Sequence, residues 1–192
     1  MADIKIICIT GYPCSGKSTA AEILKSKGFT VIELGDLVRE QMAKDPEALK
    51  FFGDIREFSK FIRERYGKSV VADWAIKKIL ADEKSGYAIT GIRTVEEYDR
   101  IRSLLKHTVL VAIEAPERLR FERMVNRARP GDPRTYEAFL ERDEKEREGL
   151  LPAGEEAYGL DVLIRKADYK IENNGTIEAL SERIGAILRS IG

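Results

Sequence analysis

Residues 11 to 18 read Gly11-Tyr12-Pro13-Cys14-Ser15-Gly16-Lys17-Ser18 and match the pattern Gly-x4-Gly-Lys-Ser/Thr without a gap. In a loop of this kind, backbone N–H groups point inward and form an anion site together with the N-terminus of the following helix. Glycine at the two ends allows backbone angles that other residues avoid, and phosphate oxygens can then approach closely. Lys17 is expected to reach the β and γ phosphates, and the Ser18 hydroxyl to bind Mg²⁺. The loop predicts a nucleoside triphosphate site.

The segments on either side of this loop support the interpretation. The apolar run from Ile4 to Thr10 predicts a strand that is buried on both faces, as in a parallel sheet. Thr19 to Lys27 carries apolar residues at helical spacing, and Gly28 is placed to end that helix. The alternative is a chance match in an ordinary glycine-rich turn, but the order of strand, loop and helix argues against it.

Composition limits the classes of protein and partner. The 192 residues include 33 Lys plus Arg and 33 Asp plus Glu, so no overall field attracts nucleic acid or an acidic membrane. The only cysteines, Cys8 and Cys14, make no disulfide framework, which fits a reducing cytosol. We find no basic leader with a long apolar run and no membrane-length apolar stretch. We expect one cytoplasmic domain over residues 1–192 with a small-molecule partner, and leave its oligomeric state open.

Strand patterns alternate with helical patterns along the rest of the chain. Four later strands are predicted, at Phe29 to Leu34, Tyr87 to Thr90, Val109 to Ile113 and Tyr169 to Ile171. Such alternation is typical of an α/β fold.

Several helix signals lie between and after these strands. Thr94-x-x-Glu97 is a capping box, Pro116 suits a first helical turn, and Asp132-Pro133 is expected to start another helix. Charges spaced four apart around Asp143 are typical of a solvated helix surface. The last helix carries an apolar face that we assign to the core, made of Ile177, Leu180, Ile184, Ile187, Leu188 and Ile191.

A helical segment of about fifty residues, 35–82, separates the second and third strands and is longer than a simple crossover needs. We expect it to hold a second substrate. Most of its aromatic residues are interpreted as packing, and most of its arginines as solvated. Asp36 and Arg39 stand out because Gly35-Asp36-Leu37-Val38-Arg39 follows the second strand, at the sheet edge where open α/β sheets bind ligands.

These motifs resemble a known group of enzymes. Gly-Asp-x-x-Arg looks like the acceptor-site motif of nucleoside monophosphate kinases of the adenylate kinase type. Gly91-Ile92-Arg93, Arg120-Phe-Glu-Arg123-x-x-x-Arg127 and the Asn173-Asn174-Gly175-Thr176 turn extend the likeness over nearly the whole chain. Taken together they resemble the archaeal adenylate-kinase-related P-loop kinases, a group that is also similar to dephospho-CoA kinases.

The resemblance implies a three-layer α/β/α P-loop kinase fold. Its five-stranded parallel sheet has the order 2-3-1-4-5, with a helical acceptor-binding insert at 35–82 and a lid at 117–148. The implied activity is transfer of the γ-phosphoryl group of MgATP to a nucleotide-like acceptor, a nucleoside or deoxynucleoside monophosphate. ATP and Mg²⁺ are the expected donor and cofactor.

The resemblance also assigns roles to residues. The expected catalytic residues are Lys17, Asp36, Arg123 and Arg127. The expected metal ligands are Ser18 and Asp36. The expected acceptor site consists of Asp36, Arg39, Arg63 and Arg93. The expected contacts to ATP are Gly11, Tyr12, Pro13, Cys14, Ser15, Gly16, Lys17, Ser18, Thr19, Asn173, Asn174 and Gly175.

One departure from this pattern keeps alternatives open. Thr90 stands where these kinases usually present an aspartate, so Asp36 becomes the leading acidic candidate. If the acceptor is dephospho-CoA, Asp36 would be the base for its ribose hydroxyl. A further alternative is an ATP-binding or ATPase module without an acceptor. Cys14 lies near Lys17 at a helix N-terminus, which predicts a lowered thiol pKa.

Overall fold

The computed structural model describes residues 4–53, 55–82, 84–129, 131–148 and 160–191. Its centre is a sheet of five parallel strands in the order β2-β3-β1-β4-β5, as predicted. The strands are β1 (Lys5–Thr10), β2 (Thr30–Glu33), β3 (Gly86–Thr90), β4 (His107–Glu114) and β5 (Tyr169–Glu172). All five lie where strand patterns were predicted. The inner strands β1, β3 and β4 are buried on both faces and are largely apolar, whereas the edge strands β2 and β5 are partly exposed.

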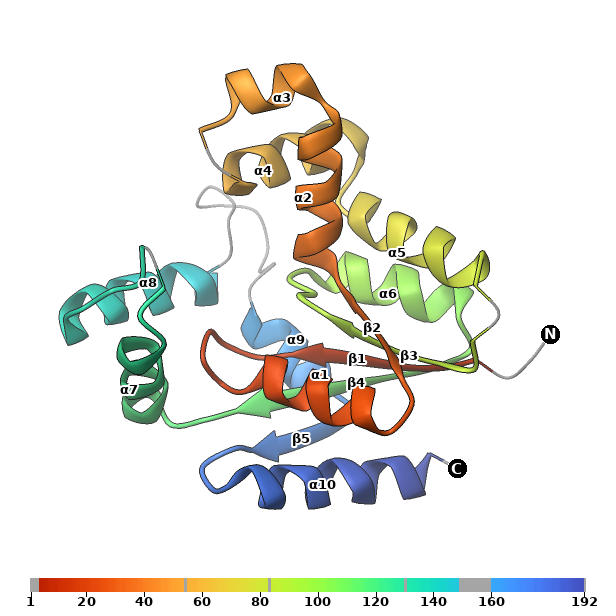
Figure 1. Ribbon diagram of the computed structural model, residues 1–192, viewed down its shortest axis with the longest axis vertical. Coiled ribbons are helices and arrows are strands. Elements are labelled where there is room, and N and C mark those ends of the chain that lie inside the picture. The colour runs from red at the N-terminus through yellow and green to blue at the C-terminus, as the bar shows by residue number, and fades with distance from the viewer. Residues whose placement is uncertain (1–3, 54, 83, 130, 149–159, 192) are drawn as a thin grey trace.

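Helices cover both faces of the sheet and make the outer two layers (Figure 1). One face packs against α1 (Lys17–Ser26) and α10 (Ile177–Ser190) through inward side chains such as Ile7 and Ile9. The opposite face packs Ile6 and Cys8 against α5 (Val70–Leu80), α6 (Val95–Leu104) and α9 (Leu160–Lys166). Because side chains alternate along a strand, β1 supplies both halves of the core.

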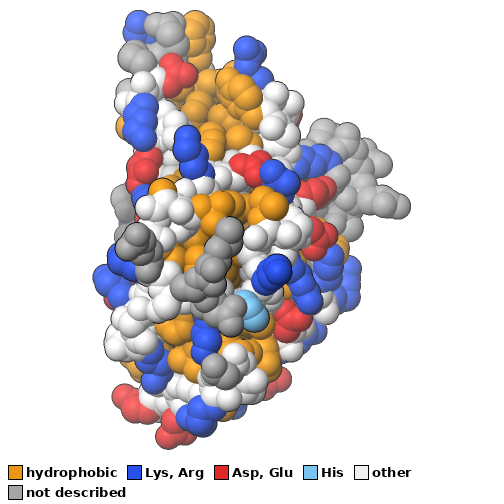
Figure 2. Space-filling model, turned by 90° about the vertical axis from the view of Figure 1, so that its right-hand side faces the viewer, with side chains coloured by type: hydrophobic (Ala, Val, Ile, Leu, Met, Phe, Trp, Pro, Cys, Tyr) orange, Lys and Arg blue, Asp and Glu red, His pale blue; other side chains and the backbone are white. Residues whose placement is uncertain are grey.

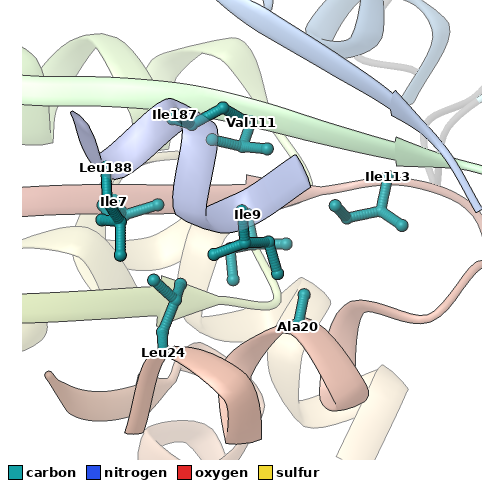
Figure 3. Close-up of a pocket in the computed structure, with 9 residues that line it drawn as sticks. Ile7, Ile9, Ala20, Leu24, Val111, Ile113, Ile187 and Leu188 are labelled. Atoms are coloured by element: carbon teal, nitrogen blue, oxygen red, sulfur yellow. The ribbon is translucent and has the colours of Figure 1, made fainter. Parts of the chain in front are cut away.

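The core under α1 and α10 contains one small gap, drawn in Figure 3. Its volume is about 10 Å³, and every residue around it is aliphatic, including Leu24 of α1 and Leu188 of α10. A gap of that size is at the lower limit for one water, and it offers no polar partner. We interpret it as a packing imperfection without chemical function.

The predicted helical segment between β2 and β3 consists of α2 (Leu34–Lys44), α3 (Pro46–Phe51), α4 (Ile55–Tyr66) and α5. The first three rise beyond the sheet (Figure 1). Phe58 of α4 is buried in the larger core cluster, which confirms a packing role for that aromatic ring. Phe51 and Tyr66 are instead largely exposed.

The remaining helices are α7 (Glu117–Arg127) and α8 (Tyr136–Glu148), which lie beyond the carboxyl ends of the strands (Figure 1). The capping box at Thr94 is confirmed, with both of its hydrogen bonds formed at the start of α6. Pro116 precedes α7 as its N-cap residue instead of lying in the first turn. Helix α9 was not predicted.

Two further predictions were wrong. Helix α8 begins at Tyr136 and not at Asp132, and the Thr135 hydroxyl accepts a hydrogen bond from the amide of Ala138. Ile177 is 63% exposed, although the rest of its helix face, including Leu180 and Ile184, packs in the core.

Charges of both signs are interspersed on the face of the molecule in Figure 2, with hydrophobic side chains between them. That face matches the balanced composition of the chain. None of the helices in the described ranges has the length and apolar character needed to cross a lipid bilayer.

Candidate functional site

The phosphate-binding loop joins the end of β1 to the start of α1. Gly11 and Gly16 have φ angles of +140° and +111°, in the region that side chains avoid. A Cβ atom on Gly11 would lie 2.1 Å from the carbonyl oxygen of Ile113. On Gly16 it would lie 2.1 Å from Nδ2 of Asn173. Both positions therefore require glycine, as predicted.

Lys17 folds back over the loop that precedes it. Its Nζ atom donates hydrogen bonds to the carbonyl oxygens of Gly11 at 2.7 Å and Tyr12 at 2.8 Å. Lysine is a compact charge on a flexible stem with three rotatable donors. Phosphate oxygens carry negative charge and are stronger acceptors than these neutral carbonyls. The ammonium is thus held at the loop by contacts that a phosphate can replace.

Asn173, at the end of β5, is built into the loop. It is 8% exposed, and its Nδ2 donates to the Ser15 carbonyl at 2.8 Å. The backbone N–H of Asn173 donates to the backbone carbonyl of Glu114 at 2.6 Å. Asn173 therefore fastens the loop to the ends of β4 and β5. Of its predicted neighbours, Gly175 lines the cleft described below, whereas exposed Asn174 does not.

Arg123 of α7 reaches the same place from the other side. Its Nη2 donates to the Asn173 carbonyl at 3.0 Å, and its Nη1 lies 3.4 Å from the carbonyl oxygens of Cys14 and Ser15. All three partners are neutral, and no carboxylate within the described ranges forms an ion pair with it. The charge of this guanidinium stays available to an anion at the loop.

Arg127, one turn further along α7, has an acidic partner. Its Nε and Nη2 donate to the two carboxylate oxygens of Asp132 at 3.0 and 2.8 Å. Arg142 of α8 shares that carboxylate, at 3.3 Å. The structure therefore distinguishes the two predicted catalytic arginines, since Arg127 is paired with a carboxylate and Arg123 with carbonyl groups.

The predicted acceptor residues lie at the start of α2, on α4 and just before α6. Arg39 and Asp36 form an ion pair with each other, with side chains 57% and 60% exposed. Asp36 is not among the residues that line the cleft, whereas Arg39 is. The predicted role of Asp36 in metal binding stays a prediction.

Arg63 and Arg93 are both connected to the buried carboxylate of Glu97. Nη2 of Arg63 donates to Glu97 Oε1 at 2.5 Å, and the amide of Arg93 donates to Oε2 at 2.9 Å. Glu97 is 0% exposed and belongs to the capping box of α6. Arg63 thus lines the cleft and also ties α4 to α6, a structural role that was not predicted.

One cleft of about 860 Å³ brings these groups together. Its lining includes six of the predicted loop residues, while Gly11, Tyr12 and Ser15 lie beneath the surface. Among the described residues, the charged side chains around it are Lys17, Arg39, Arg63, Arg93, Arg123, Arg127, Arg129, Arg142 and Lys145, with Glu33 and Asp132. The chain as a whole is neutral, so this cleft is a local concentration of positive charge suited to anionic ligands.

Glu33 is a cleft residue that sequence reasoning missed. It ends β2 and pairs in the sheet with Thr90, the position where an aspartate was expected. A Cβ on Gly35 would lie 3.4 Å from Glu33 Oε1 and 3.7 Å from Nη1 of Arg39, so both charged groups approach this glycine. Its place at the carboxyl end of a strand, where open α/β sheets bind ligands, could have indicated that Glu33 lies at the cleft. Arg142 was also missed, and its helical charge pattern gave no indication of a cleft position.

A buried cluster beneath the loop corrects the prediction for Asp143. That carboxylate is 3% exposed and binds both Nη atoms of Arg120, which is 1% exposed. The Arg120 guanidinium lies between the rings of Tyr12 and Phe139, at 4.9 and 5.4 Å. The prediction of a solvated surface was wrong because Arg120, which lies on another helix, pairs with Asp143 in the interior. The spacing of charges along α8 does not reveal such a partner.

The prediction for the Cys14 thiol was also wrong. Burial raises its pKa above the usual value for a thiol, and this effect exceeds the lowering by Arg127 and Lys17. Cys14 has a positive φ of 61° and is only partly accessible. The thiol is therefore not activated by its position in the loop.

Solved structures with a similar fold include TT1252 from Thermus thermophilus, with a TM-score of 0.67 and 22% identity over 98% of both chains. The dephospho-CoA kinase from Campylobacter jejuni has a TM-score of 0.55 and 16% identity over 100% of this chain and 99% of its own. The shikimate kinase from Aquifex aeolicus has a TM-score of 0.54 and 20% identity over 96% of both chains. These likenesses establish a shared fold.

Sequence relatives are more similar. A UPF0200 protein of Sulfurisphaera tokodaii is 36% identical over 100% of this chain and 99% of its own length. A UPF0200/UPF0201 protein of Archaeoglobus fulgidus is also 36% identical, over 97% of this chain and 55% of its own, so the chain spans about half of that relative. A family model described as an AAA domain matches residues 7–149. The chain belongs to this AAA domain family, and its curated relatives are UPF0200 proteins.

Proposed function

We propose that this protein is a kinase that transfers the γ-phosphoryl group of MgATP to a nucleoside or deoxynucleoside monophosphate. The observation that carries the proposal is the joint lining of one cleft by the phosphate-binding loop and by Arg39, Arg63 and Arg93. A loop for one phosphate chain and arginines for a second anion are what transfer between two phosphorylated molecules requires.

Catalysis in this proposal is mostly positioning and charge stabilisation. Lys17 exchanges its loop carbonyls for the β and γ phosphates of ATP. Arg123 contacts the transferring group, since its present partners are neutral carbonyls at the loop. Helices α7 and α8 act as a lid, and their closure excludes water that otherwise hydrolyses ATP.

The residues at the loop fit a magnesium ion. No cluster of three acidic, His or Cys side chains suited to a metal occurs within the described ranges. Mg²⁺ at nucleotide sites takes only one or two protein ligands, with phosphates and waters completing its shell. In this proposal Ser18, which lines the cleft, holds the ion, and Asp36 or Glu33 orients its waters. When bound, the ion neutralises charge on the β and γ phosphate oxygens.

The acceptor half depends on Arg39. Its guanidinium is more than half exposed and its partner Asp36 is equally exposed, so an entering phosphate can replace the carboxylate at little cost. Arg93 contributes a second charge from the end of β3. Arg63 is held by Glu97, and in this proposal it contributes a fixed positive charge to the wall of the cleft.

Glu33 favours a second candidate, a dephospho-CoA 3′-kinase. A hydroxyl acceptor must lose a proton during transfer, and a carboxylate near the acceptor can take it. Thr90 has no charge, but its sheet neighbour Glu33 places a carboxylate at the same edge. Under this candidate Glu33 or Asp36 is the base.

The test is release of ADP from MgATP with each of a panel of acceptors. The panel contains ribonucleoside and deoxyribonucleoside monophosphates and dephospho-CoA, and mass spectrometry identifies each product. Transfer to a monophosphate supports the first candidate, and a 3′-phosphorylated product from dephospho-CoA supports the second. If ATP binds and no acceptor is phosphorylated, an ATP-binding or ATPase module replaces the kinase proposal.

A further inference from the structure

A buried ion pair lies beside the phosphate-binding loop, and no step of the proposed transfer uses it. Arg120 of α7 is 1% exposed and Asp143 of α8 is 3% exposed. Both Nη atoms of Arg120 bond to the carboxylate, with 2.7 Å between Nη2 and Oδ2. Its Nε donates to the carbonyl of Ala115, between β4 and α7, at 3.3 Å. One guanidinium therefore connects the end of β4 with α7 and α8.

The same guanidinium faces the loop. Its Cζ lies 4.9 Å from the centre of the Tyr12 ring, and Tyr12 is 7% exposed. The carbonyl oxygen of Tyr12 accepts hydrogen bonds from Nζ of Lys17 at 2.8 Å and from the backbone amide of Ser15 at 3.2 Å. A cation over an aromatic ring is attracted more strongly where both are shielded from water. Arg120 therefore holds the residue whose carbonyl oxygen receives two other groups of the loop.

Arg123, one turn further along α7, meets the next part of the loop. Its Nη1 lies 3.4 Å from the carbonyl oxygens of Cys14 and Ser15. Residues three apart lie on the same face of a helix, so α7 presents two arginines to one loop. Arg120 contacts the ring of Tyr12, and Arg123 contacts the carbonyl groups that follow. The position of α7 determines where both arginines meet the loop.

Helix α8 determines how Arg120 is held. Asp143 binds both Nη atoms, and the ring of Phe139, also on α8, lies 5.4 Å from the guanidinium. A carboxylate that binds two nitrogens fixes the plane of the guanidinium as well as its place. A buried charge that loses its partner is strongly unfavourable, so the pair keeps α7 and α8 together. Contacts thus lead from Asp143 through Arg120 to Tyr12.

We propose that Arg120 is a positioning residue through which α8 sets the shape of the phosphate-binding loop. The ion pair with Asp143 fixes the guanidinium plane, the plane fixes the Tyr12 ring, and the ring fixes the peptide whose carbonyl oxygen Lys17 binds. Arg120 is buried and does not line the cleft, so it acts on the loop without touching the ligand. This inference rests on the proposed function only in taking MgATP as the ligand of the loop.

The test uses variants chosen to keep the fold. Arg120→Met combined with Asp143→Leu removes both charges, and exchange of a buried ion pair for apolar residues of similar size often preserves stability. Tyr12→Leu removes the ring from the loop. Arg118→Met is the matched control, because Arg118 also lies on α7 and its Cζ is 4.9 Å from the centre of the Tyr136 ring, but neither residue lines the cleft. Calorimetry measures the Kd of MgATP, and thermal melting reports stability.

We expect the double variant to bind MgATP about 10-fold more weakly, because the loop loses its preorganised shape, while its melting temperature stays near that of wild type. Tyr12→Leu should weaken binding by a similar factor. Its addition to the double variant should cost little more, because both changes interrupt the same set of contacts. Arg118→Met should bind MgATP as wild type does. In transfer assays the KM of ATP should rise and the KM of the acceptor should not.

Two results would overturn the proposal. A wild-type Kd for MgATP in the folded double variant would leave the ion pair with a structural role only. Additive losses with Tyr12→Leu would show that the pair and the ring act independently. If the double variant unfolds, Asp143→Asn, which keeps the shape and one acceptor, replaces it in the same comparison with Tyr12→Leu. A chain that binds MgATP and phosphorylates no acceptor would end the kinase proposal, whereas these Kd values would still decide the role of Arg120.

Discussion

The two halves of the cleft are built differently. In the half around the phosphate-binding loop, the key groups already have partners within the protein. Lys17 binds loop carbonyls, Asn173 binds the loop from β5, and Gly16 fits closely against that asparagine. In the half around α2, Arg39 and Asp36 pair with each other, with no further partner among the described residues, and both side chains are mostly exposed.

The two halves therefore differ in how far their geometry depends on a bound ligand. A buried, mutually bonded set of groups keeps its geometry before a substrate arrives, which lowers the cost of binding. An exposed ion pair contributes only about 0–1 kcal/mol to stability, so the protein loses little when a ligand replaces it. We infer that the loop half is preorganised and that the Arg39 end of the other half takes its final form around its ligand, whereas Arg63 is already held by buried Glu97.

The largest expected effect comes from Lys17→Ala. Removing the one lysine of the loop should lower phosphoryl transfer by about 1,000-fold or more, because the transferring phosphates lose their central cation. Thermal melting should change little, since the lost contacts include hydrogen bonds from Lys17 to the neutral carbonyl oxygens of Gly11 and Tyr12. A wild-type kcat in this variant, or its unfolding, would contradict the expected role of Lys17.

Arg63→Met and Arg39→Ala form a matched pair. The first leaves buried Glu97 without its arginine and should destabilise the fold by about 3 kcal/mol in denaturant unfolding. The second should leave stability within about 0.5 kcal/mol and raise the KM of the acceptor by about 10-fold. If Arg39→Ala leaves KM unchanged, Arg39 does not belong to the acceptor site.

Gly16→Ala and Gly28→Ala separate two kinds of strain. Both glycines have positive φ. A Cβ on Gly16 would collide with Nδ2 of Asn173, whereas nothing lies within 4 Å of a Cβ on Gly28. We expect Gly28→Ala to cost about 1 kcal/mol and Gly16→Ala about 2 kcal/mol more, with weaker ATP binding. Equal losses in urea unfolding would show that the contact with Asn173 is easily relieved.

The smallest effect concerns the Cys14 thiol. Since burial raises its pKa, a smaller fraction is thiolate at any pH near 8 than in an exposed cysteine. Alkylation by iodoacetamide, followed by mass spectrometry, should be slower than in the urea-unfolded chain and should accelerate only at more alkaline pH. Rapid labelling of the folded protein at pH 7 would contradict this expectation and indicate an open, electropositive loop.

Much of the fold was predictable because its signals are local. The three inner strands β1, β3 and β4 are largely apolar runs, and the Thr94 capping box depends on residues three apart. The start of α8 was mispredicted because Asp132 reads as a helix cap, whereas tertiary contacts with two arginines use its carboxylate. Local sequence patterns do not reveal such tertiary hydrogen bonds, which compete with helix capping for the same side chain.

The site divides in the same way. The conformation of the loop was predicted because Gly11 and Gly16 are close in sequence and both have the positive φ angles that the pattern requires. The roles of Lys17 and Ser18 stay predictions. Glu33 and Arg142 were missed because they reach the cleft only through sheet pairing and helix packing. Asn173 was predicted as a turn residue that contacts the nucleotide, while the structure gives it a hydrogen bond to the loop.

The position of β1 in the sheet has a consequence for local unfolding. β1 is paired on both sides, to β3 and β4, over nearly its whole length. Amide protons in a strand of that kind exchange with solvent only when a large part of the domain opens. The loop therefore begins from what we expect to be the slowest-exchanging segment of the chain. Local fluctuations elsewhere can open α7 or α2 without disturbing the anchor of the phosphate-binding loop.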